Sequence, residues 1–173
     1  ITTIESSAFF GCFSLKNIII PNSVTTIGLS AFARCTNLTH ITIPNRVTTI
    51  GLSAFNGCSS LTSITIPGSV RSIENYAFKS CSSLIKVNYQ GQFEPSFGIE
   101  VFANCSFSVV NVASFYSGNT FCGYPARITT PSYTFTNSDY FTQSHLHLSF
   151  TGTAFFSNSE PFTKTISSSF KES

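Results

Sequence analysis

The feature that most constrains this chain is a phrase of eight residues that begins at Ile20 and returns at a constant spacing. Its copies occupy Ile20–Ile27, Ile43–Ile50 and Ile66–Ile73. Each copy begins with Ile-Pro, has Val at its fifth position and ends in Ile. Repetition at a fixed spacing of this size is typical of solenoid proteins, in which similar units stack and each contacts only its neighbours.

Three further kinds of residue keep the same spacing between the phrases. The repeated phenylalanines, each after Ala or Val, are Phe9, Phe32, Phe55, Phe78 and Phe102. The repeated leucines are Leu15, Leu38, Leu61 and Leu84. The repeated cysteines are Cys12, Cys35, Cys58, Cys81 and Cys105. The last cysteine step is one position longer than the others, so the fifth unit carries an extra residue.

One unit is enough to predict the path of the chain. Leu38–Ile43 alternates as a strand with Leu, Ile and Ile facing inward, and Pro44 ends it because proline has no N–H for a sheet. Val47–Ile50 returns across the far side. Ser53–Cys58 forms a helical turn or short loop that buries its phenylalanine. Hydroxyls of Ser53 and its equivalents Ser30 and Ser7 are expected to accept hydrogen bonds from free backbone N–H groups there.

The predicted fold is therefore a repeat solenoid of the leucine-rich-repeat class. It has a parallel β-sheet on its concave face and short helical turns or loops on its convex face, where the phenylalanines stack. The 23-residue period lies within the range of about 20–29 residues for such repeats. A single unit cannot close a core, but four or five stacked units can.

The complete phrase, Ile-Pro-x-x-Val-x-x-Ile-x-x-x-Ala-Phe-x-x-Cys-x-x-Leu-x-x-Ile-x-Ile-Pro, resembles the BspA-like leucine-rich repeats. These occur in surface proteins of mucosal bacteria and parasitic protozoa. The resemblance covers residues 1–112, and Tyr116–Gly123 looks like the Phe-Cys-Gly ending of protozoan members. It implies a cell-surface or secreted protein that adheres to or binds host proteins, and it implies no catalytic residues.

Composition and pattern divide the chain into three parts. Residues 1–112 hold about five units, of which the last departs from the others. Residues 113–128 are predicted to cap the stack. Residues 129–173 are rich in Ser, Thr and Phe, and a six-residue phrase recurs there. This tail is either an extended, glycosylated stalk or a small β-solenoid.

The cysteines occupy one position of the repeat, so we expect them to stack as a ladder of buried free thiols. Adjacent rungs lie roughly one strand spacing apart, about 5 Å, but parallel side-chain directions oppose disulfides between them. Cys122 lies outside the ladder, and a bridge from Cys105 to Cys122 over the cap is the alternative left open. The sequence has no C-x-x-C pair, which argues against zinc.

Enzymatic, metal and nucleic-acid functions find little support. The chain contains no common catalytic or phosphate-binding motif, and we predict no cofactor and no metal. Asp139, His145 and His147 are the only local candidates for such chemistry. Only 9% of residues are charged and the net charge is +2. The excess of basic residues that is typical of nucleic-acid-binding proteins is therefore absent. No apolar run is long enough to span a membrane.

The outward positions of the predicted concave strands are the candidate binding surface. They are Lys16, Asn17, Thr39, His40, Thr42, Thr62, Ser63, Thr65, Lys86 and Asn88. The surface is rich in Thr, nearly neutral and poor in the Trp, Tyr and Arg that mark binding hot spots, so weak multivalent contacts are expected. The competing interpretation is that Thr stands there only because it suits strands.

The sequence thus favours a surface adhesin or protein-binding module. Its expected partner is a protein or glycoprotein of a host or an extracellular matrix, bound within residues 1–112. Residue 1 is not Met, so we interpret the chain as a mature or excised fragment, with an export signal upstream and an anchor downstream. The alternative is a structural or self-assembling repeat element without an external ligand.

Overall fold

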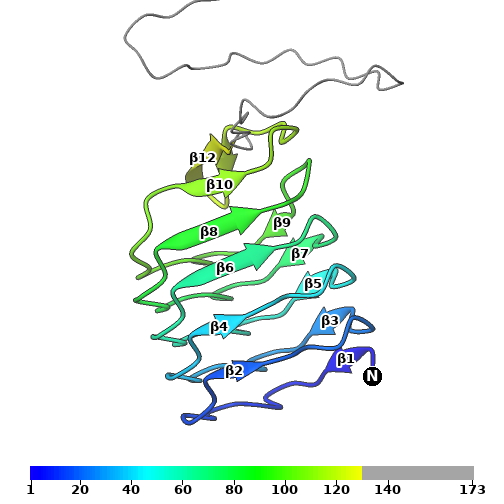
Figure 1. The fold of residues 1–173 in the computed structure, drawn as a ribbon, viewed down its shortest axis with the longest axis vertical. Coiled ribbons are helices and arrows are strands. Elements are labelled where there is room, and N and C mark those ends of the chain that lie inside the picture. The colour runs from blue at the N-terminus through cyan, green and yellow to red at the C-terminus, as the bar shows by residue number, and fades with distance from the viewer. Residues whose placement is uncertain (130–173) are drawn as a thin grey trace, which may run out of the picture. The chain divides into compact units, whose positions relative to one another are not determined.

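The computed structural model describes residues 1–129, which wind through successive coils stacked along one axis (Figure 1). Within these residues all regular structure is β-strand, and turns connect the strands. None of residues 1–129 belongs to a helix that could cross a membrane. The fold is the predicted leucine-rich-repeat solenoid with a period of about 23 residues.

One side of the stack is a parallel sheet of short strands, here called the Thr-Ile sheet. Its strands pair in chain order: β1 (Thr3–Ile4), β3 (Thr26–Ile27), β5 (Thr49–Ile50), β7 (Ser72–Ile73) and β9 (Ser96–Phe97). In the first four strands the isoleucine is buried, and the hydroxyl residue before it is half-buried on the outer face.

A second side, here called the Ile-Pro sheet, holds the predicted Leu-x-x-Ile-x-Ile segments and their C-terminal equivalents. Its parallel strands are β2 (Asn17–Ile18), β4 (His40–Ile41), β6 (Ser63–Ile66), β8 (Lys86–Tyr89), β10 (Val110–Val112) and β12 (Tyr124–Ile128). β2 pairs with β4, while β6, β8, β10 and β12 pair in that order. β4 and β6 lie in contact between these two groups (Figure 1). β11 (Thr120–Phe121) pairs antiparallel with β12.

Register explains the repeat, because each residue lies beside its own equivalent in the next coil. Ile18 pairs with Ile41 and Ile27 with Ile50, so both steps equal the period of the sequence. In the fifth coil, Ile73 pairs with Phe97, one position beyond that period, whereas Val87 pairs with Val110 in the regular register. The extra residue therefore enters between residues 89 and 96, and the following segment up to residue 110 is one residue shorter.

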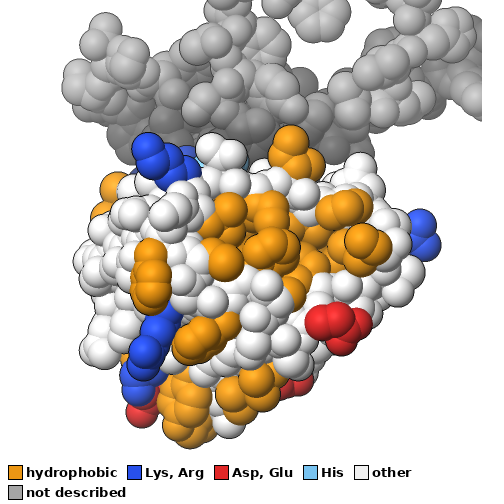
Figure 2. Space-filling view, turned by 90° about the horizontal axis from the view of Figure 1, so that it is seen from below, with side chains coloured by type: hydrophobic (Ala, Val, Ile, Leu, Met, Phe, Trp, Pro, Cys, Tyr) orange, Lys and Arg blue, Asp and Glu red, His pale blue; other side chains and the backbone are white. Residues whose placement is uncertain are grey.

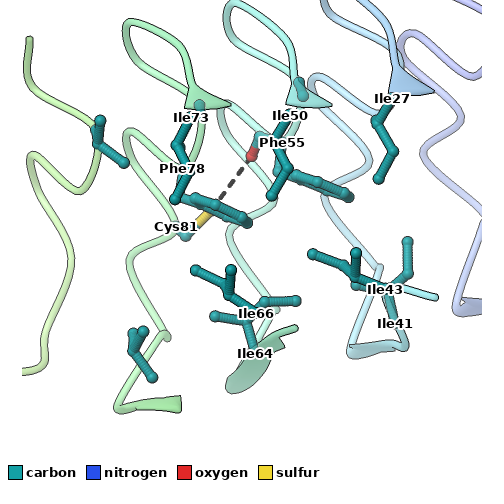
Figure 3. Packing of buried hydrophobic residues seen from close by; sticks show 14 of the residues in the cluster. Ile27, Ile41, Ile43, Ile50, Phe55, Ile64, Ile66, Ile73, Phe78 and Cys81 are labelled. Atoms are coloured by element: carbon teal, nitrogen blue, oxygen red, sulfur yellow. Dashed lines mark hydrogen bonds between the residues drawn. The ribbon is translucent and has the colours of Figure 1, made fainter. Parts of the chain in front are cut away.

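The third side is a ladder of phenylalanine rings. Phe9, Phe32, Phe55, Phe78 and Phe102 stack with centroids 5.0, 5.3, 5.1 and 5.2 Å apart and ring planes within 10° of parallel. Figure 3 shows Phe55 and Phe78 between the isoleucines of the Thr-Ile sheet and those of the Ile-Pro sheet. Burying each such ring stabilises the fold by about 1.5–3 kcal/mol, so one ladder holds both sheets together.

The turns that carry the rings contain no helix within the described residues, so the loop alternative of the prediction is correct. Two residues per turn have left-handed backbone, such as Ser30 at φ 50° and Arg34 at φ 60°. The serine hydroxyls were expected to accept hydrogen bonds from backbone N–H groups in these turns. Instead the serine backbone donates: Ser30 N bonds to Leu52 O at 2.8 Å and Ser53 N to Asn75 O at 2.9 Å. These bonds join each turn to the next coil.

Two features go beyond the sequence prediction. The returning segment Val47–Ile50 was expected only to cross the far side, and its end is a strand of the Thr-Ile sheet. In addition, β12 continues the Ile-Pro sheet into the segment predicted as a cap. The boundaries at residues 112 and 128 remain predictions, and the tail at residues 130–173 lies outside the described residues.

Aromatic side chains close the C-terminal end of the ring ladder. Phe107 meets Phe102 edge-on, with centroids 5.1 Å apart and an interplanar angle of 89°. Tyr124 of β12 approaches the same ring edge-on at 6.1 Å. Edge-to-face contacts are favourable because the positive ring edge meets the negative ring face. Their geometry ends the parallel stacking, so this end differs from the regular coils.

Candidate binding surface

The outer face of the Ile-Pro sheet brings the predicted binding residues together. Asn17 lies beside His40, Ser63 beside Lys86 and Thr65 beside Asn88 in the pairing of the strands. The remaining predicted residues flank the same strands. Seven of the ten side chains are exposed, and Ser63, Thr65 and Asn88 are half-buried. The strand pairing therefore places the outward residues of β2, β4, β6 and β8 side by side, and Thr39 and Thr42 line the hollows beside them. The role of all ten residues in binding remains a prediction.

Hollows run along this face, here called the sheet groove. One of about 530 Å³ is lined by Asn17, Thr39, His40 and Thr42 among others. A second of about 290 Å³ shares His40 and Thr42 with the first and includes Thr65 and Gln90. A third of about 460 Å³ shares Thr65 and Gln90 with the second. Because neighbouring hollows share lining residues, they form one continuous groove across the coils.

The C-terminal part of the groove holds a ladder of amides that sequence reasoning missed. Asn88 Nδ2 donates to Thr65 Oγ1 at 3.3 Å, and Asn111 Nδ2 donates to Asn88 Oδ1 at 3.2 Å. Gln90 and Phe115 line the same hollow. Asn88 was predicted to face outward, but Asn111, Gln90 and Phe115 were not considered. The constant spacing from Thr65 to Asn88 to Asn111, equal to the period, is the signal that could have found the ladder.

The groove is almost free of charge. Among the described residues, His40 is the one titratable side chain that lines the two N-terminal hollows, and Lys16 and Lys86 lie nearby on the same face. The carboxylates of residues 1–129 are Glu5, Glu74, Glu94 and Glu100, and none of them lines the groove. The lining therefore offers hydrogen bonds and apolar contact, and the charged groups in the strands beside it are Lys86 and Arg127.

The Thr-Ile sheet provides an internal comparison. Its outer row carries a hydroxyl side chain in every coil: Thr3, Thr26, Thr49, Ser72 and Ser96. The preceding hydroxyls tie coils together, since Thr25 Oγ1 donates to Thr2 O at 3.1 Å and Thr48 Oγ1 to Thr25 O at 3.2 Å. A hollow of about 320 Å³ beside Ser72 lies near the end of this sheet.

The equivalent row of the Ile-Pro sheet varies instead. It runs Asn17, His40, Ser63 and Lys86, so amide, imidazole, hydroxyl and ammonium groups follow one another. Strand propensity alone would favour Thr or another β-branched residue at each of these positions. One hydroxyl here does join coils, because Thr39 Oγ1 donates to Lys16 O at 3.2 Å. The varied row nevertheless distinguishes this face from the Thr-Ile sheet.

The cysteines form a ladder, as their spacing predicted, with differences at its ends. Cys35, Cys58 and Cys81 are buried, Cys105 is half-buried and Cys12 is exposed. Each of the four thiols after Cys12 donates to the carbonyl of a phenylalanine in the preceding coil, at 3.0–3.2 Å. Figure 3 shows this bond from Cys81 to Phe55.

Burial keeps these thiols protonated. It raises the pKa of Cys35 from 9.0 to about 11 and that of Cys58 to about 12. Burial also raises the pKa of Cys122, with the nearby Glu94 carboxylate adding to the effect. All six cysteines within residues 1–129 are free thiols, so the Cys105–Cys122 bridge is absent from the structure. The buried thiols of Cys35, Cys58 and Cys122 therefore serve packing rather than chemistry.

The first coil presents an apolar face at the N-terminal end of the stack. Figure 2 shows hydrophobic side chains gathered over this end. Phe10 and Phe13 are about half exposed, and Phe9, Leu15 and Ile18 are partly buried against the core. Arg34 lies over the Phe10 ring, 5.8 Å from its centroid.

Catalytic and metal chemistry find no clear site in the described part of the chain. Residues 1–129 contain no group of three or more His, Cys, Asp or Glu side chains that could hold a metal ion. The candidates named from the sequence, Asp139, His145 and His147, lie outside the described residues.

Comparison with known proteins identifies what the coils resemble. The family model described as "BspA type Leucine rich repeat region" matches six copies over residues 2–126. No sequence among curated proteins matches the chain closely enough to count as a relative. Solved structures of similar fold include a leucine-rich repeat protein from Bacteroides ovatus, at 24% identity and a TM-score of 0.55. That match covers 67% of this chain and 36% of the other.

Two further structures are more similar in sequence. A leucine-rich cell surface protein from Faecalibacterium prausnitzii shares 30% identity with a TM-score of 0.58, over 66% of this chain and 30% of that one. A leucine-rich repeat protein from T. pallidum shares 34% identity with a TM-score of 0.59, over 64% and 52% respectively. The chain therefore spans about a third to a half of these proteins.

Proposed function

Since the chain belongs to the family of BspA-type leucine-rich repeats, we propose that it is a binding module exposed at the cell surface or secreted. Its ligand is a protein or glycoprotein of a host or an extracellular matrix, held on the outer face of the Ile-Pro sheet. The similarity to a structure described as a leucine-rich cell surface protein supports this location.

The observation that carries the proposal is the difference between the two sheets. Both sheets consist of short strands with buried isoleucines on the inner face. Strand propensity alone would therefore favour the same residue types on both outer faces. The Thr-Ile sheet carries Thr or Ser in every coil, whereas the Ile-Pro sheet places different polar groups in successive coils. A surface whose chemistry changes from coil to coil can distinguish ligands by the order of their groups.

The residues that line the groove determine how strongly one copy of the chain can bind its ligand. It is nearly neutral and lacks the large Trp and Arg anchors that usually dominate binding energy. One copy should therefore bind weakly, and many copies on one surface would supply affinity through avidity. Fixed strands reduce the cost of ordering the surface on binding.

The test compares lysine substitutions on the two sheets. Thr39→Lys with Thr42→Lys changes exposed residues that line the sheet groove, and Thr26→Lys with Thr49→Lys changes the same residue type on the Thr-Ile sheet. Each chain is displayed in many copies on beads and offered a panel of immobilised matrix glycoproteins. We expect the first variant to lose at least tenfold in apparent affinity and the second to keep it. Equal losses, or loss in the second alone, would refute the proposal.

A second candidate function is self-association through the first coil, which the exposed Phe10 and Phe13 favour. The aromatic closure by Phe107 and Tyr124 makes the other end dissimilar, so two copies would meet through their first coils. Sedimentation equilibrium tests this: Phe10→Ser with Phe13→Ser should abolish a dimer, whereas the exposed Phe93→Ser should not. A wild-type chain that stays monomeric at high concentration rejects this candidate.

A further inference from the structure

The amide ladder fixes polar groups in a defined orientation on the Ile-Pro sheet. Because Asn88 donates to Thr65 and Asn111 donates to Asn88, neither amide can flip alone without losing a hydrogen bond. Each amide nitrogen carries two hydrogens and each amide oxygen has two lone pairs. One N–H of each asparagine, the Oδ1 of Asn111 and the second lone pair of Asn88 Oδ1 are therefore left for a ligand, and hydrogen bonds already order these side chains before binding.

The lining of the hollow beside the ladder is neutral but not uniformly polar, and the exposed Arg127 of β12 pairs with Asn111 next to it. The hollow of about 460 Å³ is also lined by Gln90, Ser114, Phe115 and Thr129. No ionisable side chain of the described residues lines it other than the buried Tyr89. Phe115 is 59% exposed, so an apolar ring stands beside the hydrogen-bonding groups. An exposed ring next to ordered amides offers a ligand both an apolar face and paired donors and acceptors.

These features select the chemistry of the ligand. A charged group inside the hollow would lose hydration without a partner of opposite charge, because Arg127 lies beside Asn111 but does not line the hollow. A ligand rich in hydroxyls gains from the amides, because each hydroxyl both donates and accepts. The C–H face of a sugar ring is apolar and can pack on Phe115. Neutral sugars satisfy all three requirements.

Spacing argues against an extended peptide lying along the ladder. Equivalent residues on adjacent strands are about 4.8 Å apart, and the rings of neighbouring coils lie 5.0–5.3 Å apart. Residues facing the same way in an extended peptide recur about every 6.6 Å. A peptide would fall out of step with the amides after one pair.

We propose that Asn88, Asn111 and Phe115 form a subsite for a neutral oligosaccharide, the glycan part of a glycoprotein ligand. This rests on the proposed function, since it gives the ligand of that groove a chemical class. The amides hydrogen-bond sugar hydroxyls, and the phenylalanine ring packs against the sugar face. The N-terminal part of the groove is left to contact the protein part of the ligand.

The experiment titrates the full chain, labelled with ¹⁵N, with short neutral oligosaccharides of glucose, galactose, mannose or N-acetylglucosamine. The side-chain amide signals of Asn88 and Asn111 report binding directly. We expect at least one sugar series to shift both signals, and Asn88→Asp, Asn111→Ala and Phe115→Ala each to weaken binding at least fivefold. The control Asn37→Asp changes an exposed amide that lines none of the three hollows of the sheet groove and should leave binding unchanged.

A second measurement separates this inference from the proposed function. Binding to the matrix glycoproteins is repeated after enzymatic removal of their glycans. Loss of binding together with sugar-induced shifts supports the subsite. Full binding to the deglycosylated proteins, without any shift from sugars, overturns the subsite and leaves the proposed function standing. Shifts caused only by deglycosylated protein or by peptide would likewise overturn it, because they assign the amides to a peptide.

Discussion

The two sheets of this solenoid share a core and a repeat but differ on their outer faces. On the Thr-Ile sheet, side-chain hydroxyls tie each coil to the one before, as Thr25 and Thr48 do. On the Ile-Pro sheet, the outer row changes from coil to coil and faces a groove that ends in the amide ladder. The fold itself accounts for the uniform hydroxyl row of the Thr-Ile sheet, whereas we propose that the varied row of the Ile-Pro sheet serves a ligand.

The largest effect should come from the ring ladder, which serves both sheets equally. Phe55 is fully buried between Phe32 and Phe78. Phe55→Ala should lower the free energy of unfolding by about 3–5 kcal/mol, because it leaves a cavity in the core. Urea unfolding monitored in both sheets should show one shared transition, and sheets that unfold separately would contradict a common core.

The matched control for this substitution is Phe13→Ala. The Phe13 side chain is 58% exposed, so its removal leaves no cavity in the core. The free energy of unfolding should therefore change by only about 0.5 kcal/mol or less. A loss as large as that of Phe55→Ala would show that burial in the ladder is not the cause.

The buried thiols should make both sheets sensitive to alkaline pH. Below pH 9 the thiols are protonated in folded and unfolded chains, so they have no effect on stability. Above that pH the unfolded chain releases protons that Cys35 and Cys58 retain in the fold until about pH 11 and 12. Stability should therefore fall as pH rises through this window. Cys35→Ala with Cys58→Ala should flatten the fall in urea-unfolding measurements, and an unchanged slope would show that these thiols do not cause it.

A smaller effect should separate the sheets directly. Thr48→Val removes the hydroxyl that donates to Thr25 O on the Thr-Ile sheet, and should cost about 0.5–1 kcal/mol. Thr42→Val removes an exposed hydroxyl beside the groove and should leave the unfolding free energy nearly unchanged. Thermal unfolding of the two variants makes the comparison. Equal losses would mean that hydroxyls on both faces serve the fold alike.

The smallest effect should come from a turn outside both sheets. Arg34 has left-handed backbone, while its equivalents Gly11 and Gly57 are glycines. Arg34→Gly should stabilise the chain by up to about 1 kcal/mol, because glycine adopts this conformation without steric cost. Arg46→Gly, at an exposed position without this backbone, should not stabilise it. Thermal midpoints decide between them, and a destabilised Arg34→Gly would show that the arginine side chain, over the Phe10 ring, outweighs the backbone cost.

Much of the fold follows from the sequence because every position contacts its own equivalent one coil away. The period therefore predicted the spacing of rings and thiols and the register of the strands. It did not reveal the Thr-Ile sheet, since two-residue strands are too short to show alternation. It missed β12 because Tyr124–Ile128 lacks the repeated leucine and contains a proline, which is rarely found inside a sheet.

The candidate surface could be predicted only in part from the sequence. Outward positions such as His40 and Lys86 follow from the strand pattern, and the structure places them on one face. The amide ladder lies where the repeat degenerates, so Asn111 was not aligned with Thr65 and Asn88. Phe115 follows β10, and its place beside the ladder depends on the path of the chain after that strand. No pattern in the sequence specifies that path.

The central claim, that ligands bind the Ile-Pro sheet rather than the Thr-Ile sheet, is tested most directly by site-specific cross-linking. A photoreactive side chain replaces Thr42 in one version of the chain and Thr49 in another, and each is illuminated with a bound matrix glycoprotein. The account predicts a covalent product from position 42 and none from position 49. A product from position 49 alone, or equal yields from both, would contradict it.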